Sequence, residues 1–472
     1  MSESAKKGDA ADRLGSEPVA KLLVRFSIPA ITGMLVNALY NVVDRVFVGR
    51  GVNEIALGGL SLAMPLMTIN MAFAMLFGIG SANMISMRLG QGRREEAENA
   101  LNHCFFLLVL VSLVFLTLGL IFIDPLLSIL GAQEGSGALE YAEKYLRIIL
   151  FGALFGMVGF GFSHCTRAQG FPTITMIGML IGAVLNMLLD PLFIFVFHWG
   201  VEGAAWATII SQLVSALWVL SFNLGKRAVI RLRLRTFRPS PRIIRQIMAF
   251  GSAQFLLQLM MSGIQLLYNT SAGWYGAATL GVANGGDIAL SGMNIVGSVV
   301  MMILMPVFGI NQGAQPILGY NYGAKKFRRV LRAYLGAVGA ATTICVLGFA
   351  VGELFPHFLV ALFAPRGSQA LLAFAPWAMR VHLLFLPLNG FQIVSTNFFV
   401  VTGRPKISIF LSMLRQFIVL IPCLLIFGKI WGLWGLVAAA PVADGFSFLL
   451  TGIMIFFELR KLRIAAKAPI QL

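Results

Sequence analysis

Long apolar runs repeat along the whole chain, and they constrain its fold more than any other feature. Twelve stretches rich in Leu, Ile, Val, Phe and Met are separated by short polar breaks. A bilayer core of ~30 Å needs ~20 apolar residues per helix, and the runs lack the alternation typical of transmembrane β-strands. We therefore predict an all-α polytopic membrane protein with twelve transmembrane helices. The composition agrees, because 58% of the residues are hydrophobic and only 12% are charged.

The expected spans fall into two groups of six on either side of a basic segment. They cover residues 22–48, 58–86, 101–123, 140–165, 174–197 and 203–222, then 248–272, 288–314, 331–352, 378–401, 408–427 and 433–457. The chain is thereby divided into an N-terminal tail (1–21), a first lobe (22–222), a linker (223–247), a second lobe (248–457) and a C-terminal tail (458–472).

Lysine and arginine concentrate in alternate loops. With a cytoplasmic N-terminus, 28 of the 36 basic residues lie in inner segments and 7 in outer ones. The positive-inside rule then predicts a multi-pass protein of the cell membrane (plasma or inner membrane) with both termini cytoplasmic. The net charge of +17 is therefore interpreted as a topology signal and not as a sign of a nucleic-acid partner.

The sequence offers no sign of a disulfide framework, a zinc cluster or a signal peptide. All four cysteines, Cys104, Cys165, Cys345 and Cys423, fall inside apolar runs. The first 21 residues are polar, and no apolar run precedes a small-residue cleavage site. The first helix is therefore expected to act as its own insertion signal.

The two halves carry matching motifs at a nearly constant spacing. Phe77-Gly78-Ile79 recurs as Phe308-Gly309-Ile310, and the same offset of 231 pairs Gly92 with Gly323. Later motifs, such as Trp199-Gly200 and Trp431-Gly432, keep the offset between 231 and 233. Two pseudo-symmetric six-helix lobes of the same orientation are typical of secondary transporters, whose substrate passes between the halves. The sequence has no GxxxxGK[ST] loop for ATP, so we expect an ion gradient to drive transport.

Two carboxylates are expected at matching depth in the outer half of the first lobe. Asp44 lies near the end of helix 1, and Asp190 lies late in helix 5. Asn186 shares a face with Asp190 because it precedes it by four residues, and Thr208 reaches a similar depth from helix 6. Taken alone, Asp44 is equally compatible with a helix cap. The Asn186 amide and the Thr208 hydroxyl, each taken alone, are compatible with hydrogen bonds between helices. Together the four side chains would be costly inside a membrane unless they bind a proton or a small cation.

The second lobe lacks this set of side chains. The repeat aligns Asp44 with Ala272, Thr208 with Ala440, and Asp190 with Pro422 or Cys423. The cation site is therefore expected in the first lobe alone.

Other polar or helix-breaking residues give weaker signals. Pro29 in helix 1 predicts either a hinge or a static kink. Arg380 in helix 10 and Asp444 in helix 12 would either face a charged substrate or pair with each other, and pairing is the favoured interpretation. Asp287 lies at an outer boundary and is a further candidate for facing substrate. The many Phe and Met side chains would give a cleft an adaptable apolar lining.

Several long motifs resemble the multidrug and toxic compound extrusion (MATE) family, in particular its MepA-like branch. The similarity extends along essentially the whole chain. It is carried by Leu39-Tyr40-Asn41-Val-Val-Asp44-Arg-Val-Phe47, Asn186-x-x-x-Asp190-Pro191, Gly203-Ala-Ala-Trp-Ala-Thr208, Gly285-Gly-Asp287 and Pro306-x-x-Gly309-Ile-Asn-Gln-Gly313-Ala-Gln-Pro316.

The resemblance implies a monomeric antiporter that expels amphiphilic, often cationic drugs and dyes in exchange for H⁺ or Na⁺ by alternating access. It implies no enzymatic activity and no cofactor beyond the coupling ion. The cation site of the family would be carried here by Asp44, Asn186, Asp190 and Thr208. Tyr145 in helix 4 and Asn37 below Asp44 would support it.

This sequence departs from the family in its second lobe. NorM-type members carry acidic residues in helices 7 and 10, whereas here helix 7 offers Gln254 and Gln258 and helix 10 offers Arg380. We therefore expect these residues to face substrate, and we do not expect a cation site in the second lobe.

Three alternatives remain open at this point. A flippase or exporter of lipid-linked or other amphiphilic metabolites, from the same superfamily, would need cationic side chains in its cleft to meet diphosphate. An intramembrane aspartyl protease would need a GxGD motif, which Asn284-Gly285-Gly286-Asp287 only approaches. A channel would fit less well with two pseudo-symmetric lobes than alternating access does.

Overall fold

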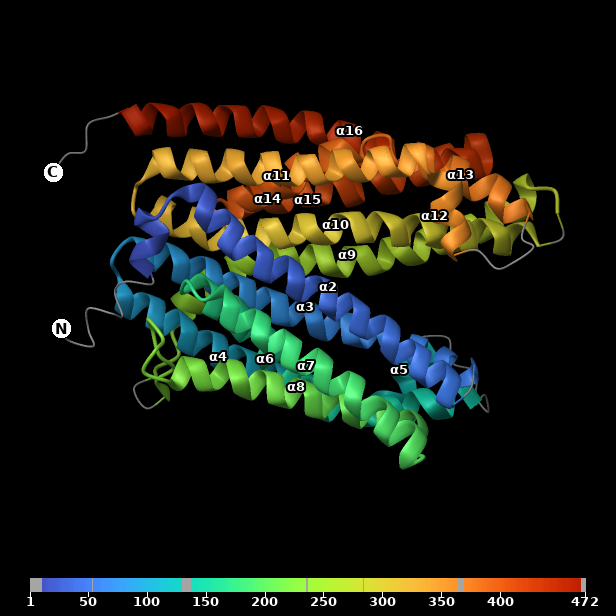
Figure 1. The fold of residues 1–472 in the computed structure, drawn as a ribbon, viewed down its shortest axis with the longest axis horizontal. Coiled ribbons are helices and arrows are strands. Elements are labelled where there is room, and N and C mark those ends of the chain that lie inside the picture. Colours follow the sequence, from blue (N-terminus) through green and yellow to red (C-terminus); the bar gives the residue numbers. More distant parts are fainter. Residues whose placement is uncertain are drawn as a thin grey trace. The chain divides into compact units, whose positions relative to one another are not determined.

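The structure is a computed structural model that describes residues 11–52, 54–129, 137–234, 237–282, 284–363 and 369–467. Within these ranges the chain forms helices joined by short turns, apart from the longer linker between α8 and α9, and it contains no β-strand (Figure 1). The prediction of an all-α fold is confirmed.

The first half of the chain contains seven named α-helices and one π-helical turn. They are α2 (Val19–Gly51), α3 (Glu54–Gly90), α4 (Arg94–Ile121), α5 (Ile123–Ile129), α6 (Gly137–Ala168), α7 (Pro172–Pro191), η1 (Leu192–Val196) and α8 (Gly200–Leu224). The second half contains α9 (Pro241–Thr279), α10 (Gly285–Gly323), α11 (Phe327–Leu354), α12 (Pro356–Phe363), α13 (Gln369–Leu383), α14 (Leu386–Val401), α15 (Pro405–Met413), the π-helix η3 (Leu414–Leu420) and α16 (Ile421–Lys467).

These helices supply twelve segments that can cross a membrane. Ten helices of the described chain are long and apolar enough, and α13 with α14 forms an eleventh span bent by 46°. The last of the ten, Pro405–Ala466, is interrupted at Gly432, where φ is 59° and ψ is −136°, and so makes two segments. The expected number of twelve is confirmed, and most of the helices extend a few residues beyond the predicted spans.

The chain divides into two compact units. Unit 1 comprises Met1–Pro18, Ile28–Gln258 and Gly319–Lys325, and unit 2 comprises Val19–Ser27, Leu259–Leu318 and Lys326–Leu472. Helix α2 therefore changes unit between Ser27 and Ile28, next to Pro29.

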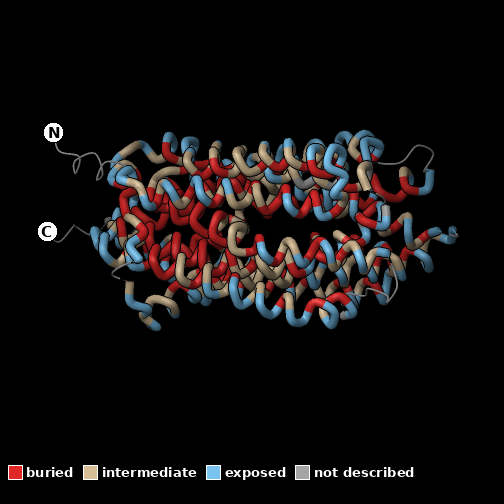
Figure 2. The backbone as a smooth tube through the Cα atoms, turned by 90° about the horizontal axis from the view of Figure 1, so that it is seen from below, coloured by how far each residue is buried: buried red, intermediate tan, exposed pale blue. Residues whose placement is uncertain are grey.

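Glycine permits close helix contacts inside each unit. In unit 1, a Cβ on Gly78 of α3 would lie 2.6 Å from the Cα of Gly161 in α6. In unit 2, a Cβ on Gly390 of α14 would lie 2.6 Å from the carbonyl carbon of Ala341 in α11. Small residues at such crossings let the backbones approach. Figure 2 shows buried and exposed positions along the helices, as expected when one face packs against protein and another meets lipid.

The backbone conformation shows which residues of the two halves are equivalent. Residues with positive φ recur at Gly92 (74°) and Lys325 (57°), and at Gly200 (58°) and Gly432 (59°). The offset at the first turn is thus 233, so the pairing of Gly92 with Gly323 was wrong.

Gly323 is instead the equivalent of Gly90. A Cβ on Gly90 would lie 2.0 Å from the Tyr320 carbonyl oxygen, and one on Gly323 would lie 2.2 Å from the Met87 carbonyl oxygen. Met87 and Tyr320 are themselves 233 residues apart, so the two contacts repeat each other. Gly323 is needed for this close approach and not for the turn.

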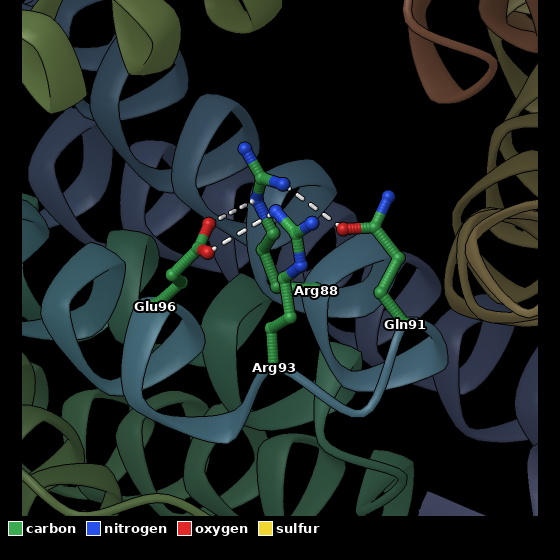
Figure 3. A network of polar contacts seen from close by, with 4 residues as sticks. All are labelled: Arg88, Gln91, Arg93 and Glu96. Carbon is green, nitrogen blue, oxygen red and sulfur yellow. Dashed lines mark hydrogen bonds and ion pairs between the residues drawn. The ribbon is translucent and has the colours of Figure 1, made fainter.

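Salt bridges brace the turn between α3 and α4 (Figure 3). Glu96 accepts from Arg88 Nε at 3.0 Å and from Arg93 Nη1 at 3.2 Å. Arg88 Nη1 also donates to Gln91 Oε1 at 2.9 Å. Such surface pairs contribute little to stability.

The basic linker is fastened to unit 1. Backbone N–H groups of Ile230, Arg233 and Ser240 donate to Gln169 Oε1 (3.2 Å), Asn102 Oδ1 (2.9 Å) and His103 Nε2 (2.8 Å). Because three buried side chains accept these bonds, the described part of the linker is an ordered segment.

Candidate cation and drug site

Helices α7 and α8 bring three of the predicted site residues together. Asn186 and Asp190 lie one helical turn apart on α7, and α8 packs against α7 and supplies Thr208. Asn186 Nδ2 donates to Asp190 Oδ1 at 3.3 Å and to Thr208 Oγ1 at 3.5 Å. All three are buried, and Asp190 is fully buried at 0% exposure. A single amide therefore links the carboxylate and the hydroxyl.

Helix α2 adds Asp44 to this group. Asp44 and Asp190 lie close enough for their carboxyl groups to interact electrostatically, and Tyr40 lies within range of both. Asp190 Oδ2 and Asn186 Oδ1 are buried and accept no hydrogen bond from the part of the chain that the structure describes. A buried charged oxygen without a donor is costly, so this arrangement favours a proton or a small cation between the carboxyl groups.

A cavity in unit 1 lies beside Asn186, the residue that contacts Asp190. Its volume is about 410 Å³, and Asn186 and Thr208 form part of its wall. Five methionines also line it, namely Met64, Met67, Met71, Met157 and Met179. Thioether side chains are flexible and polarizable, and they adapt to ligands of different shapes.

Two glycines keep the cavity open. Gly156 of α6 and Gly182 of α7 both line it. A Cβ on Gly156 would lie 2.8 Å from Gln212 Oε1, and one on Gly182 would lie 3.3 Å from the Ser215 Cβ. A larger side chain at either position would enter the cavity.

Several polar residues of the wall were missed by the sequence analysis. They are Tyr40, Asn70, Ser211 and Gln212. Ser211 and Gln212 follow Thr208 by three and four residues, so the rule of shared helix faces could have found them. Asn70 lies in the middle of an apolar run, which is a usual sign of a functional position in a membrane helix.

The supporting residues lie in two different environments. Asn37 lines the cavity. Tyr145 is buried in a hydrophobic cluster that includes Val48 and Ile194. Pro29 lies inside α2, which remains helical through it. The roles assigned to these residues remain predictions.

The residues expected to face substrate are not gathered at one place. Gln258 lines the cavity of unit 1, whereas Gln254, one turn earlier on α9, is not part of its wall. Asp287 is exposed in the first turn of α10. Arg380 is exposed and lies 3.8 Å from a Glu353 carboxylate oxygen.

The expected pairing of Arg380 with Asp444 was wrong. Asp444 instead accepts from Arg415 Nε at 2.6 Å and from Asn389 Nδ2 at 3.0 Å. Arg415 lies in the π-helix η3, which packs against α16, whereas Arg380 pairs with Glu353 of α11. Each arginine thus pairs with a carboxylate that lies closer to it.

Comparison of the whole sequence with known families assigns the chain to one of them. The family model described as MatE matches residues 29–192 and 255–425, which is more than half of the chain. The chain belongs to the MatE family. The resemblance seen in the sequence, to MepA-like MATE transporters, is confirmed.

Individual relatives are similar to this MATE protein over nearly their full length. It is 27% identical to the multidrug export protein MepA of Staphylococcus aureus over 442 residues, covering 93% of this chain and 94% of that protein. A solved outward-facing conformation of a multidrug resistance MATE family transporter is 27% identical, with a TM-score of 0.87 and coverage of 96% and 98%. A MATE structure in the bent conformation is 26% identical, with a TM-score of 0.88 and coverage of 97% and 99%. The fold is thus that of two-lobed MATE transporters.

Proposed function

We propose that this MATE transporter exports amphiphilic, often cationic drugs and dyes in exchange for H⁺ or Na⁺ by alternating access. One observation carries the proposal: Asp190 Oδ2 is buried without a donor among the described residues, close to Asp44, and its neighbour Asn186 lines a cavity. Asn186 contacts Asp190 and also lines the cavity. The ion site and the drug site therefore share a side chain.

Shared side chains give a physical basis for antiport. A proton or Na⁺ that enters from outside neutralises the carboxyl pair and removes the negative potential that favours a cationic drug. Asn186 and Thr208 then rearrange around the ion, the cavity becomes smaller, and drug is released outward. Loss of the ion to the cytoplasm restores the negative potential. A bend of α2 at Pro29 is the conformational step that we propose to accompany this change.

The membrane potential supplies enough energy. One elementary charge that moves inward through ~100 mV yields ~2.3 kcal/mol, which corresponds to a ~50-fold drug gradient. For a drug with one positive charge, one-for-one exchange moves no net charge, so two ions for each drug molecule are needed to gain this energy from the potential.

The lining of the cavity distinguishes drug export from a flippase for lipid-linked diphosphates. Neither lysine nor arginine is among the described residues of the wall. A diphosphate would need cationic donors at this place. Methionine, phenylalanine and neutral amides fit amphiphilic cations better, because they offer dispersion contacts and do not repel positive charge.

We further propose that the protein acts as a monomer in the cell membrane with both termini cytoplasmic. The distribution of lysine and arginine supports this orientation. No cofactor is required in this scheme beyond the coupling ion.

The function is tested by dye efflux from proteoliposomes with separately imposed H⁺ and Na⁺ gradients. We expect concentrative transport of a cationic dye under one of the two gradients and its collapse when a matching ionophore is added. Transport that ignores both gradients would contradict the proposal.

A further inference from the structure

Unit 2 carries large polar side chains at the places where unit 1 has its cavity. The positive-φ residues give a repeat offset of 233 at Gly170 and Gly403 and of 232 at Gly200 and Gly432. We apply 233 through Gln416 and 232 from Gly432 onward to relate the two sets. It pairs Gly156 with Asn389, Gly182 with Arg415, Gln212 with Asp444, Gly159 with Gln392, and Ala183 with Gln416. All five unit 1 members line the cavity.

Contacts inside each unit support this correspondence. In unit 1, the Cβ position of Gly156 points at Gln212 Oε1. In unit 2, Asn389 Nδ2 reaches Asp444 Oδ2 at 3.0 Å. The same two helix positions thus face each other in both units, and only in unit 2 do side chains meet there.

The π-helix η3 distinguishes the unit 2 segment further. It spans Leu414–Leu420 and carries both Arg415 and Gln416, whereas the corresponding part of α7 is α-helical. π-Helical segments are rare and occur frequently at functional sites. Here η3 carries Arg415, whose Nε lies 2.6 Å from Asp444 Oδ1.

The cluster in unit 2 is buried. Asp444, Asn389, Gln392 and Gln416 are all less than 7% exposed. Arginine and asparagine replace two glycines, so they fill volume that is empty in unit 1. Because the carboxylate accepts from both neighbours, the charge pair is satisfied where it lies.

We propose that Arg415, Asp444 and Asn389 close the unit 2 counterpart of the cavity and thereby confine drug binding to unit 1. The proposal rests on the proposed function, since it takes the unit 1 cavity as the drug site. It makes these three residues determinants of binding specificity and stoichiometry: one drug molecule binds to each chain.

The test transplants the unit 1 residues into unit 2. The variant Asn389→Gly/Arg415→Gly/Asp444→Gln is purified, and ethidium binding at equilibrium is compared with that of the wild type. We expect about one ethidium per chain in the wild type and about two in the variant. Arg415→Met/Asp444→Leu is the matched control, because it removes the charges and retains the volume, and it should still bind one.

A second measurement does not depend on the folding of the triple variant. Ser215 lines the unit 1 cavity, and Ser447 is its buried equivalent in unit 2. Ser215→Cys should react with a small thiol reagent and be protected by ethidium, whereas Ser447→Cys should react much more slowly with or without ethidium.

Specific results would overturn the inference. These are one ethidium per chain in a folded triple variant, two in the charge-free control, or ethidium protection of Ser447→Cys. A different result would show that the unit 1 cavity is not the drug site. In that case Gly156→Leu, as a single substitution, would leave ethidium binding unchanged.

Discussion

Gln212 and Asp444 occupy equivalent places 232 residues apart, yet Gln212 lines a cavity and Asp444 forms an ion pair with Arg415. Two halves with the same helix plan have therefore become different in chemistry. Unit 1 has a cavity, acceptor oxygens and a carboxyl pair, whereas the equivalent positions in unit 2 hold a buried, ion-paired cluster.

Filling the cavity should weaken drug binding. In Gly156→Leu the new side chain would meet Gln212 and occupy part of the space. We expect ethidium affinity to fall about tenfold or more, which corresponds to ~1.4 kcal/mol. Equilibrium binding to the purified variant measures this effect. Gly339→Leu is the control, because a Cβ there meets nothing within 4 Å, and equal affinities in the two variants would count against the site.

Replacing one partner of the unit 2 ion pair should lower the stability of the protein more than replacing both partners. Arg415→Met leaves the buried Asp444 carboxylate unpaired, with an expected loss of about 3 kcal/mol in the free energy of unfolding. Arg415→Met/Asp444→Leu leaves no charge and should unfold close to the wild-type temperature. Thermal unfolding in detergent measures both variants. A double variant that is less stable than the single one would contradict this interpretation of the pair.

Removal of the His103 ring should loosen the basic linker. The His103→Ala variant leaves the Ser240 N–H without its acceptor, which costs about 1–3 kcal/mol. We expect trypsin to cleave at the linker at least several-fold faster than in the wild type. Arg242→Ala, an exposed change on α9, should leave the cleavage pattern of the rest of the linker as it was. Unchanged cleavage in His103→Ala would show that this contact does not hold the linker.

The charge distribution predicts which turns are extracellular. Val282, in the turn between α9 and α10, is exposed and is expected outside, whereas Arg227 in the linker is expected inside. In intact cells, a membrane-impermeant thiol reagent should label Val282→Cys and not Arg227→Cys. The wild type serves as the blank, since three of its four cysteines are buried. The opposite labelling would invert the topology.

Much of the fold could be predicted because apolar length and charge asymmetry are set by the bilayer. The contact between Asn186 and Asp190 also follows from helical spacing alone. The bond between Asn389 and Asp444 does not, because it depends on how α14 packs against α16. Periodicity places a residue on a face of its helix, but it does not say which helix that face meets.

The register of the repeat shows why identical letters can mislead. Gly92 and Gly323 match in sequence, yet Lys325 takes the positive φ of the second turn. Lysine there accepts a conformation that costs it energy, while Gly323 is required for contact with the Met87 backbone. Glycine can be required either for a positive φ or for a close backbone contact, and the sequence alone does not distinguish these two reasons.

The central claim is that the buried Asp190 carboxyl couples the ion gradient to drug movement. Its most direct test compares Asp190→Asn with Asp124→Asn, an exposed change on α5, in proteoliposomes that hold the same amount of protein. Gradient-driven accumulation of ethidium and equilibrium ethidium binding are measured on both variants. We predict that Asp190→Asn binds ethidium but no longer concentrates it, while Asp124→Asn does both. Full gradient-driven transport by Asp190→Asn would contradict the account.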